Sequence, residues 1–350
     1  MILVLVYHKV IKYPTFDLWW KTFDLQCSIL KKHFKVITLD QVIEALSEGK
    51  LPKEPSVAIT FDDGYADNYI YAYPILKKHR LKATLFVASS RIIKESGKRK
   101  NLEDYWKGKV SYRELYSPKS MWQANYLFLK EGKEADFLTQ EELLSMMDVF
   151  EIGWHSKYHT KDFFQDRIID LVDGKNYHWS VIHAYGEEPV RGFPLFPMKG
   201  SLCVLRGKVR KEVKTFIKSL DDKFFQRKNW KEHLKKELLK NFDSFLEFET
   251  QEERVKRIRK EIEESLQELK SITGVNVVHS AYPFGDYDPL LKEELSKRFV
   301  SAFTTEKRCI TVQEDMHLLP RITVPKDMWS FLAILGKFVG SFLVRSGWRR

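Results

Sequence analysis

The length and composition of the chain fit one folded, barrel-sized core with insertions: it has 350 residues, of which 43% are hydrophobic. Its three cysteines, Cys27, Cys203 and Cys309, are odd in number and widely spaced. This spacing indicates neither a disulfide framework nor a zinc ribbon, and a reducing compartment fits best. The formal net charge of +11 leaves attraction to an anionic partner open.

The N-terminal segment, residues 1–7, is predicted to be a buried strand. It is too short for a secretory signal and lacks a basic start and a small-residue cleavage site, so a cytoplasmic location is expected. His8 ends this strand as either a hydrogen-bonded core histidine or part of a site. The next predicted elements are a helix within 16–33, a strand over 35–39 and a helix over 41–47 capped by Asp40.

The next stretch joins a short apolar run, Val57 to Phe61, to Asp62, Asp63 and Gly64. The run predicts a buried parallel strand, and the glycine permits a tight exit into a helical segment. Two carboxylates about 4 Å apart both stay ionised only beside a cation or a strong donor. The pair therefore predicts a metal ligand next to a general base.

A second strand, over 151–155, ends in His155, and His159 follows four residues later. That spacing lets two imidazoles converge on one ion if the segment turns helically. With one carboxylate they would form a three-ligand site with positions left open for water and substrate, as in catalytic metal centres.

Three motifs resemble those of the polysaccharide deacetylase family, the NodB-type carbohydrate esterases. They are Thr60 to Gly64, His155 to His159, and Ser280 to Tyr287 in the form of the poly-N-acetylglucosamine deacetylase branch. The resemblance implies an α/β fold, a distorted (β/α)7 barrel with the NodB homology fold. It also implies hydrolysis of N-acetyl groups on a sugar, a polysaccharide or a glycan precursor. The implied cofactor is a divalent metal, zinc before cobalt or nickel.

The resemblance also implies roles for individual residues. Asp62 would be the general base that activates a metal-bound water, and the metal ligands would be Asp63, His155 and His159. The backbone N–H of Phe284 would stabilise the oxyanion. The implied substrate-binding residues are His8, Tyr282, Pro283, Phe284 and Arg321.

The chain departs from the family pattern at two positions. Ala281 stands where many members have an arginine that pairs with the base, and Arg321 stands where a histidine often acts as general acid. Arg321 could supply the missing cation. His317 is the first candidate for the acid because it lies near the altered motif; the alternatives are His8, His178 and His183.

Two insertions interrupt the predicted barrel of residues 1–325. The first, about 89–138, is irregular and aromatic, and the second, about 160–253, has the charged helices of a lid or substrate-selecting subdomain. Each follows a strand, so each is expected on the active-site side. Residues 206–260 hold 18 Lys and Arg against 10 Asp and Glu. That excess fits solvated helix faces, an anionic membrane or acidic glycan, or nucleic acid, although no nucleic-acid motif is present.

The tail, residues 326–350, is predicted to be an apolar and basic helix. It is apolar from Met328 to Val344, apart from Lys337 and small polar residues, and then carries Arg345, Arg349 and Arg350. It either covers the barrel or lies in the interface of an anionic membrane, which would place the protein peripherally at the inner membrane face. The interior lysine and marginal length disfavour a span.

Two other functions fit parts of the sequence. A phosphoesterase could use the same aspartate and histidine pairs, but no glycine-rich anion cradle is present. A non-catalytic membrane- or nucleic-acid-binding protein on a degenerate barrel would not need all four acid and histidine positions. The expected partner is therefore an N-acetylated carbohydrate.

Overall fold

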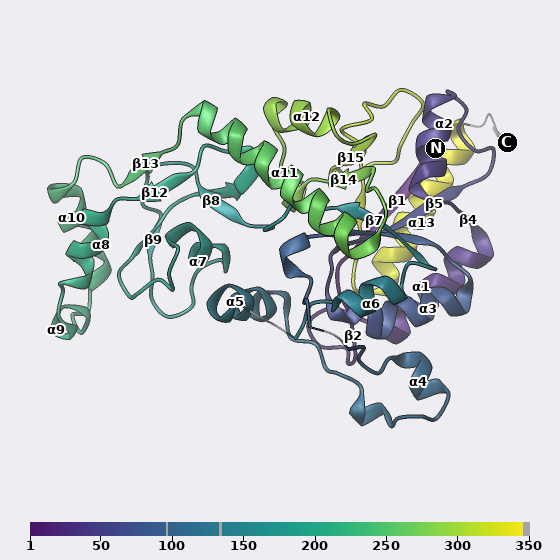
Figure 1. Cartoon of the computed structure of the whole chain (residues 1–350), viewed down its shortest axis with the longest axis horizontal. Helices are drawn as coiled ribbons and strands as arrows, with labels where there is room; N and C mark the ends of the chain where they lie inside the picture. Colours follow the sequence, from purple (N-terminus) through teal and green to yellow (C-terminus); the bar gives the residue numbers. More distant parts are fainter. Residues whose placement is uncertain (96, 133–134, 346–350) are drawn as a thin grey trace. The chain divides into compact units, whose positions relative to one another are not determined.

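The chain folds into two compact units, seen in the computed structural model, which describes residues 1–95, 97–132 and 135–345 (Figure 1). Unit 1 comprises Met1–Ala124, Glu134–Tyr158 and Glu261–Arg350. Unit 2 comprises Asn125–Lys133 and His159–Lys260. The chain therefore leaves unit 1 directly after Tyr158 and returns to it at Glu261.

Unit 1 is built on a parallel sheet in the order β15-β14-β7-β6-β5-β1-β16, with β4 beside β5. The strands are β1 Ile2–Tyr7, β4 Lys35–Val36, β5 Ser56–Asp63, β6 Ala83–Val87, β7 Phe150–Trp154, β14 His279–Ala281, β15 Ser301–Phe303 and β16 Ile322–Thr323. Every residue of β1, β5 and β6 is buried, as expected for parallel strands covered on both faces.

The two edges of this sheet meet at the segment 319–323. Leu319 bridges to Phe303 of β15, and Ile322 pairs with Leu5 of β1, both in parallel. The sheet therefore curls back on itself into a distorted barrel, which confirms the predicted fold class. Because the strands are parallel, the residues that follow β1, β5, β6, β7 and β14 lie at one end of the barrel.

The helices of unit 1 alternate with these strands. They are α1 Trp20–His33, α2 Leu39–Ser47, α3 Tyr73–His79 after a π-helical turn at Asn68–Ala72, α4 Leu102–Trp106, α6 Gln140–Ser145, α12 Pro289–Ser296 and α13 Met328–Arg345. Helix α5, Met121–Glu131, and helix α11, Gln251–Thr273, each contribute residues to both units.

The sequence misplaced the ends of the first elements. Helix α1 begins at Trp20 and not near Phe16, and the strand predicted to run to Leu39 ends at Val36. The N-cap of α2 is Thr38 and not Asp40. Thr38 accepts a hydrogen bond from the N–H of Gln41, whose side chain bonds back to the Thr38 N–H, and this capping box starts the helix early.

Unit 2 contains an antiparallel sheet in the order β11-β8-β12-β13 and a ribbon of β9 with β10. Its strands are β8 Lys161–Phe163, β9 Asp170–Leu171, β10 Pro194–Leu195, β11 Met198–Gly200, β12 Gly207–Val209 and β13 Leu246–Phe248. Its helices are α7 Ser180–Tyr185, α8 Lys211–Lys218, α9 Asp222–Phe225 and α10 Trp230–Asn241. Several of its cations form ion pairs inside the unit, including Arg206 with Asp162 and Lys231 with Asp170. Internal pairing therefore accounts for part of the basic charge of this segment.

The C-terminal helix α13 packs on the barrel along one face only. Its buried side chains are Phe331, Leu335, Phe338 and Phe342, at helical spacing. The ring of Phe338 stacks on that of Phe34, with 6.1 Å between centroids. Trp329 and Val344 remain 84% and 75% exposed. By length and composition α13 would also suffice to cross a membrane.

Candidate active site

Strand β5 ends in Asp62 and Asp63 through a left-handed turn. Asp63 has φ of 78° and Gly64 has φ of 85°. A glycine adopts this conformation without steric cost, and aspartate is among the few other residues that tolerate it. The turn gives the two neighbouring carboxylates different partners: Asp62 meets Arg321, whereas Asp63 faces the histidines.

The strand register brings Asp63 and His155 together although 91 positions separate them in the sequence. Asp63 pairs with Val87 of β6, and Val87 pairs with Trp154 of β7, the residue before His155. Ser280 of β14 is level with Trp154, so the following residue, Ala281, lies beside His155.

The hydrogen bond between His155 and Ala281 orients the imidazole. Nδ1 of His155 lies 2.9 Å from the backbone carbonyl of Ala281. Because a carbonyl can only accept, Nδ1 carries a hydrogen, which leaves Nε2 as the candidate ligand atom. Nε2 lies 3.5 Å from Oδ1 of Asp63 and 3.7 Å from Oδ2 of Asp62.

Asp63, His155 and His159 form a candidate metal centre. Each offers one ligand atom, these atoms lie within 4.8 Å of one another, and all three residues are buried. Two imidazoles and one carboxylate suit zinc and similar divalent ions and leave coordination positions open. The donor set therefore fits the metal expected from the sequence.

Arg321 forms a buried, bidentate ion pair with Asp62. Nη1 and Nη2 lie 2.7 Å and 2.8 Å from the two carboxylate oxygens, and Nε donates to the carbonyl of Thr304. Burial alone would raise the pKa of Asp62, but the charge and hydrogen bonds of Arg321, with a contribution from His155, hold it well below its usual range. Arg321 is fully buried, and its guanidinium contacts the predicted base directly.

Among the histidines that the sequence offers as the general acid, the structure brings His8 close to Asp62. Tyr7 pairs with Phe61, so His8 follows β1 at the level of Asp62, and its charge contributes to lowering the pKa of Asp62. His8 is half-buried. The imidazole of His317 instead lies 2.9 Å from the carbonyl of Phe299, just before β15 begins and therefore at the opposite end of that strand from the site.

The predicted substrate wall follows β14. Tyr282 is buried and its hydroxyl donates to the carbonyl of His317, so the side chain packs inside the barrel. Pro283 begins a 3-10 turn that contains Phe284, whose φ of 61° is left-handed. The turn begins two residues after Ala281, whose carbonyl group binds His155.

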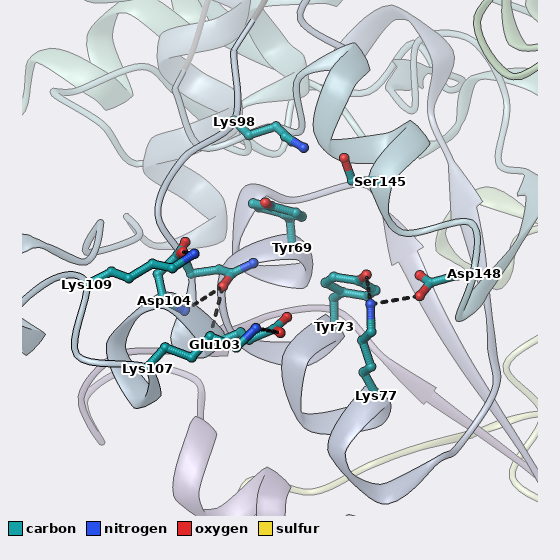
Figure 2. Close-up of a pocket in the computed structure, with 11 residues that line it drawn as sticks. Tyr69, Tyr73, Lys77, Lys98, Glu103, Asp104, Lys107, Lys109, Ser145 and Asp148 are labelled. Atoms are coloured by element: carbon teal, nitrogen blue, oxygen red, sulfur yellow. Dashed lines mark hydrogen bonds and ion pairs between the residues drawn. The ribbon is translucent and has the colours of Figure 1, made fainter.

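A separate hollow of about 430 Å³ lies on the flank of unit 1 (Figure 2). Tyr69 and Tyr73 stack there with ring centroids 5.9 Å apart, and Lys77 reaches both the Tyr73 hydroxyl and Asp148. None of the predicted site residues lines this hollow.

The fold and these side chains define the protein as an α/β barrel with a candidate divalent-metal centre. Comparisons with solved structures agree on the fold. The de-N-acetylase of Aggregatibacter actinomycetemcomitans aligns with 96% of this chain and 99% of its own, with a TM-score of 0.55 and 14% identity. IcaB of Ammonifex degensii aligns with 95% of both chains, with a TM-score of 0.52 and 17% identity.

Sequence comparison finds similarity over one part of the chain. Residues 49–168 match the polysaccharide deacetylase family. The chain is 37% identical over 90 residues to YxkH, a polysaccharide deacetylase-type protein of Bacillus subtilis, and 40% identical over 75 residues to the poly-β-1,6-N-acetyl-D-glucosamine N-deacetylase of Staphylococcus aureus. These stretches cover 25% and 21% of this chain and 32% and 26% of the relatives. These partial matches agree with the family that the motifs resemble, over the segment that carries the aspartate pair and both histidines.

Proposed function

We propose that the protein is a metal-dependent hydrolase that removes N-acetyl groups from an N-acetylated sugar polymer or glycan precursor. The observation that carries the proposal is the division of labour at the end of β5, with Asp62 paired to Arg321 and Asp63 grouped with two histidines. The named activity of the staphylococcal relative supports the same substrate class.

Asp63, His155 and His159 would hold the ion, with zinc expected before cobalt or nickel. When bound in such an open site, a divalent ion supplies Lewis acidity and lowers the pKa of water. Asp62 accepts the proton of the attacking water, and Arg321 keeps its carboxylate ionised and oriented. The N–H of Phe284 donates a hydrogen bond to the developing oxyanion. Fixed dipoles lower the activation barrier most where charge develops in the transition state.

His8 is the proposed proton donor to the leaving amine, in place of His317. Because His8 lies beside Asp62, it would reach the same part of the substrate as the base does. His317 is held by the Phe299 carbonyl at the other end of β15. The remaining sequence candidates, His178 and His183, belong to unit 2.

We further propose that α13 touches an anionic membrane surface from the cytoplasmic side. Its outer face exposes Trp329 and Val344, and a cavity of about 940 Å³ beside the helix is bordered by Lys307, Lys337 and Arg345. Apolar side chains flanked by cations suit a surface of acidic headgroups. Cys27, Cys203 and Cys309 form no disulfide bond among the described residues, which suits the proposed reducing compartment.

The direct test is a substrate panel assayed with and without a chelator. We expect acetate and a free amine from β-1,6-linked N-acetylglucosamine oligomers, and loss of both products after chelation with recovery on adding zinc. A phosphodiester substrate should not be cleaved. Cleavage of the phosphodiester without acetate release would favour the phosphoesterase alternative, and no turnover of any substrate by the metal-loaded protein would favour a non-catalytic barrel.

A further inference from the structure

The loop between the two histidine ligands adopts an unfavourable backbone conformation. Ser156 has φ of 67° and His159 has φ of 47°, both in the left-handed region. Non-glycine residues remain there only where the surrounding structure enforces it. The groups that hold this loop therefore also determine where the ligand side chains lie.

Three consecutive residues after β6 hold the carbonyl groups of the loop. The N–H of Ser89 donates to the carbonyl of Ser156 at 3.3 Å, and the N–H of Ser90 donates to the carbonyl of Lys157 at 3.1 Å. The buried Arg91 donates from Nη2 to the carbonyl of Tyr158 at 3.1 Å. The carbonyl groups of the loop are therefore held by the segment that directly follows strand β6.

The amide groups of the loop are held from α11, more than 100 positions later. Oε1 of the buried Glu261 accepts hydrogen bonds from the N–H groups of Lys157 at 3.1 Å and Tyr158 at 3.4 Å. The ammonium of Lys157 pairs with Glu264 at 3.0 Å and with Glu268 at 2.9 Å. A carboxylate that accepts two backbone N–H groups fixes the relative orientation of two successive peptides.

We propose that Glu261 is a positioning residue for the metal centre, acting through the backbone of the loop between His155 and His159. The inference rests on the proposed metal function. The chain leaves unit 1 after Tyr158 and returns to it at Glu261. Glu261 is thus the first residue back in unit 1, and it binds the loop that ends where the chain leaves that unit. Groups behind metal ligands tune affinity because they limit ligand movement.

The test is titration of the metal-free full-length protein with Co²⁺, followed by visible absorption. Glu261→Ala should weaken Co²⁺ binding roughly 10- to 100-fold and alter the spectrum, since ligand geometry changes. Glu261→Gln should bind within a few-fold of the wild type, because its amide oxygen can accept the same two N–H groups. Glu263→Ala is the matched control, an exposed residue on the same helix, and should leave binding unchanged.

His155→Ala separates failure of the inference from failure of the metal site. If His155→Ala binds Co²⁺ like the wild type, the proposed metal centre itself is wrong. If His155→Ala loses binding while Glu261→Ala keeps wild-type affinity and spectrum, the role of Glu261 is overturned. Should Glu261→Ala fail to fold, Glu261→Asp replaces it: its side chain is one methylene shorter, which withdraws the accepting oxygen from both N–H groups, so unchanged affinity would overturn the role equally.

Discussion

Arg321 donates one hydrogen bond to each carboxylate oxygen of Asp62, at 2.7 Å and 2.8 Å, in the buried interior of the barrel. The family pattern places an arginine at the position of Ala281, and here the cation comes from the segment that closes the barrel. Loss of one partner in a buried ion pair leaves an uncompensated charge. The pair therefore links the chemistry of the site to the stability of the fold.

This pairing predicts the effect of Arg321→Met on stability. The variant should lose roughly 3–5 kcal/mol of unfolding free energy, measured by urea denaturation, because the Asp62 charge stays buried without its partner. Adding Asp62→Asn should recover most of that loss. Lys35→Met, which breaks an exposed pair with Glu54, should cost about 1 kcal/mol or less. A double variant as unstable as the sum of its parts would contradict the pairing.

The choice of general acid predicts different outcomes at two histidines. His8→Gln should lower kcat for N-acetylglucosamine oligomers by roughly 10²- to 10⁴-fold while metal content stays at the wild-type level. His317→Gln should change kcat little, because its imidazole binds the carbonyl of Phe299 away from the site. The reverse pattern in steady-state kinetics would restore His317 as the acid.

The sequence was sufficient to predict the parts of this site that lie on one short segment. It was insufficient to predict contacts between segments far apart in the sequence. The strand that ends in Asp62 and Asp63 and the strand before His155 were predictable, since each is a short apolar run that stops at polar residues. The sequence could offer Arg321 only as a possible replacement cation. Its contact with Asp62 depends on the closing segment 319–323, which pairs with strands far away in sequence.

Glu261 was missed for the same physical reason. Nothing in its neighbourhood distinguishes it from the other acidic residues of the charged helix α11, and its partners lie over 100 positions earlier. A weak signal was available: a carboxylate at a position where the apolar periodicity of α11 demands burial, next to the buried Ile262. A buried carboxylate requires hydrogen-bond donors.

The exposed face of α13 predicts salt-sensitive binding to anionic vesicles. Trp329→Glu/Val344→Glu should abolish sedimentation with vesicles containing phosphatidylglycerol at low salt, because both side chains are exposed and lie outside the packed face. The control Leu144→Glu/Val275→Glu introduces the same charges at other exposed apolar positions and should still bind. Wild-type protein that stays in the supernatant at low salt would contradict membrane contact.

The environment of His178 predicts a loss of stability in mild acid. Burial, with the nearby charge of Lys161, lowers the pKa of His178 to about 4. A histidine whose pKa is depressed on folding binds its proton more readily when unfolded, so stability falls as pH drops from 6.5 towards 4. Between pH 7 and pH 5, wild type should lose about 2 kcal/mol more unfolding free energy than His178→Gln. Parallel pH profiles from denaturant unfolding would refute the assignment.

A comparison of Asp62→Asn with Asp63→Asn tests whether the two neighbouring carboxylates have different roles. These neighbouring, isosteric changes are assigned to different tasks, so metal content and acetate release should be determined on the same preparations. We expect Asp62→Asn to retain a full complement of zinc with turnover reduced roughly 10²- to 10⁴-fold. Asp63→Asn should lose both zinc and turnover. Full zinc occupancy in Asp63→Asn, or near-normal acetate release by Asp62→Asn, would contradict the division of labour at the end of β5.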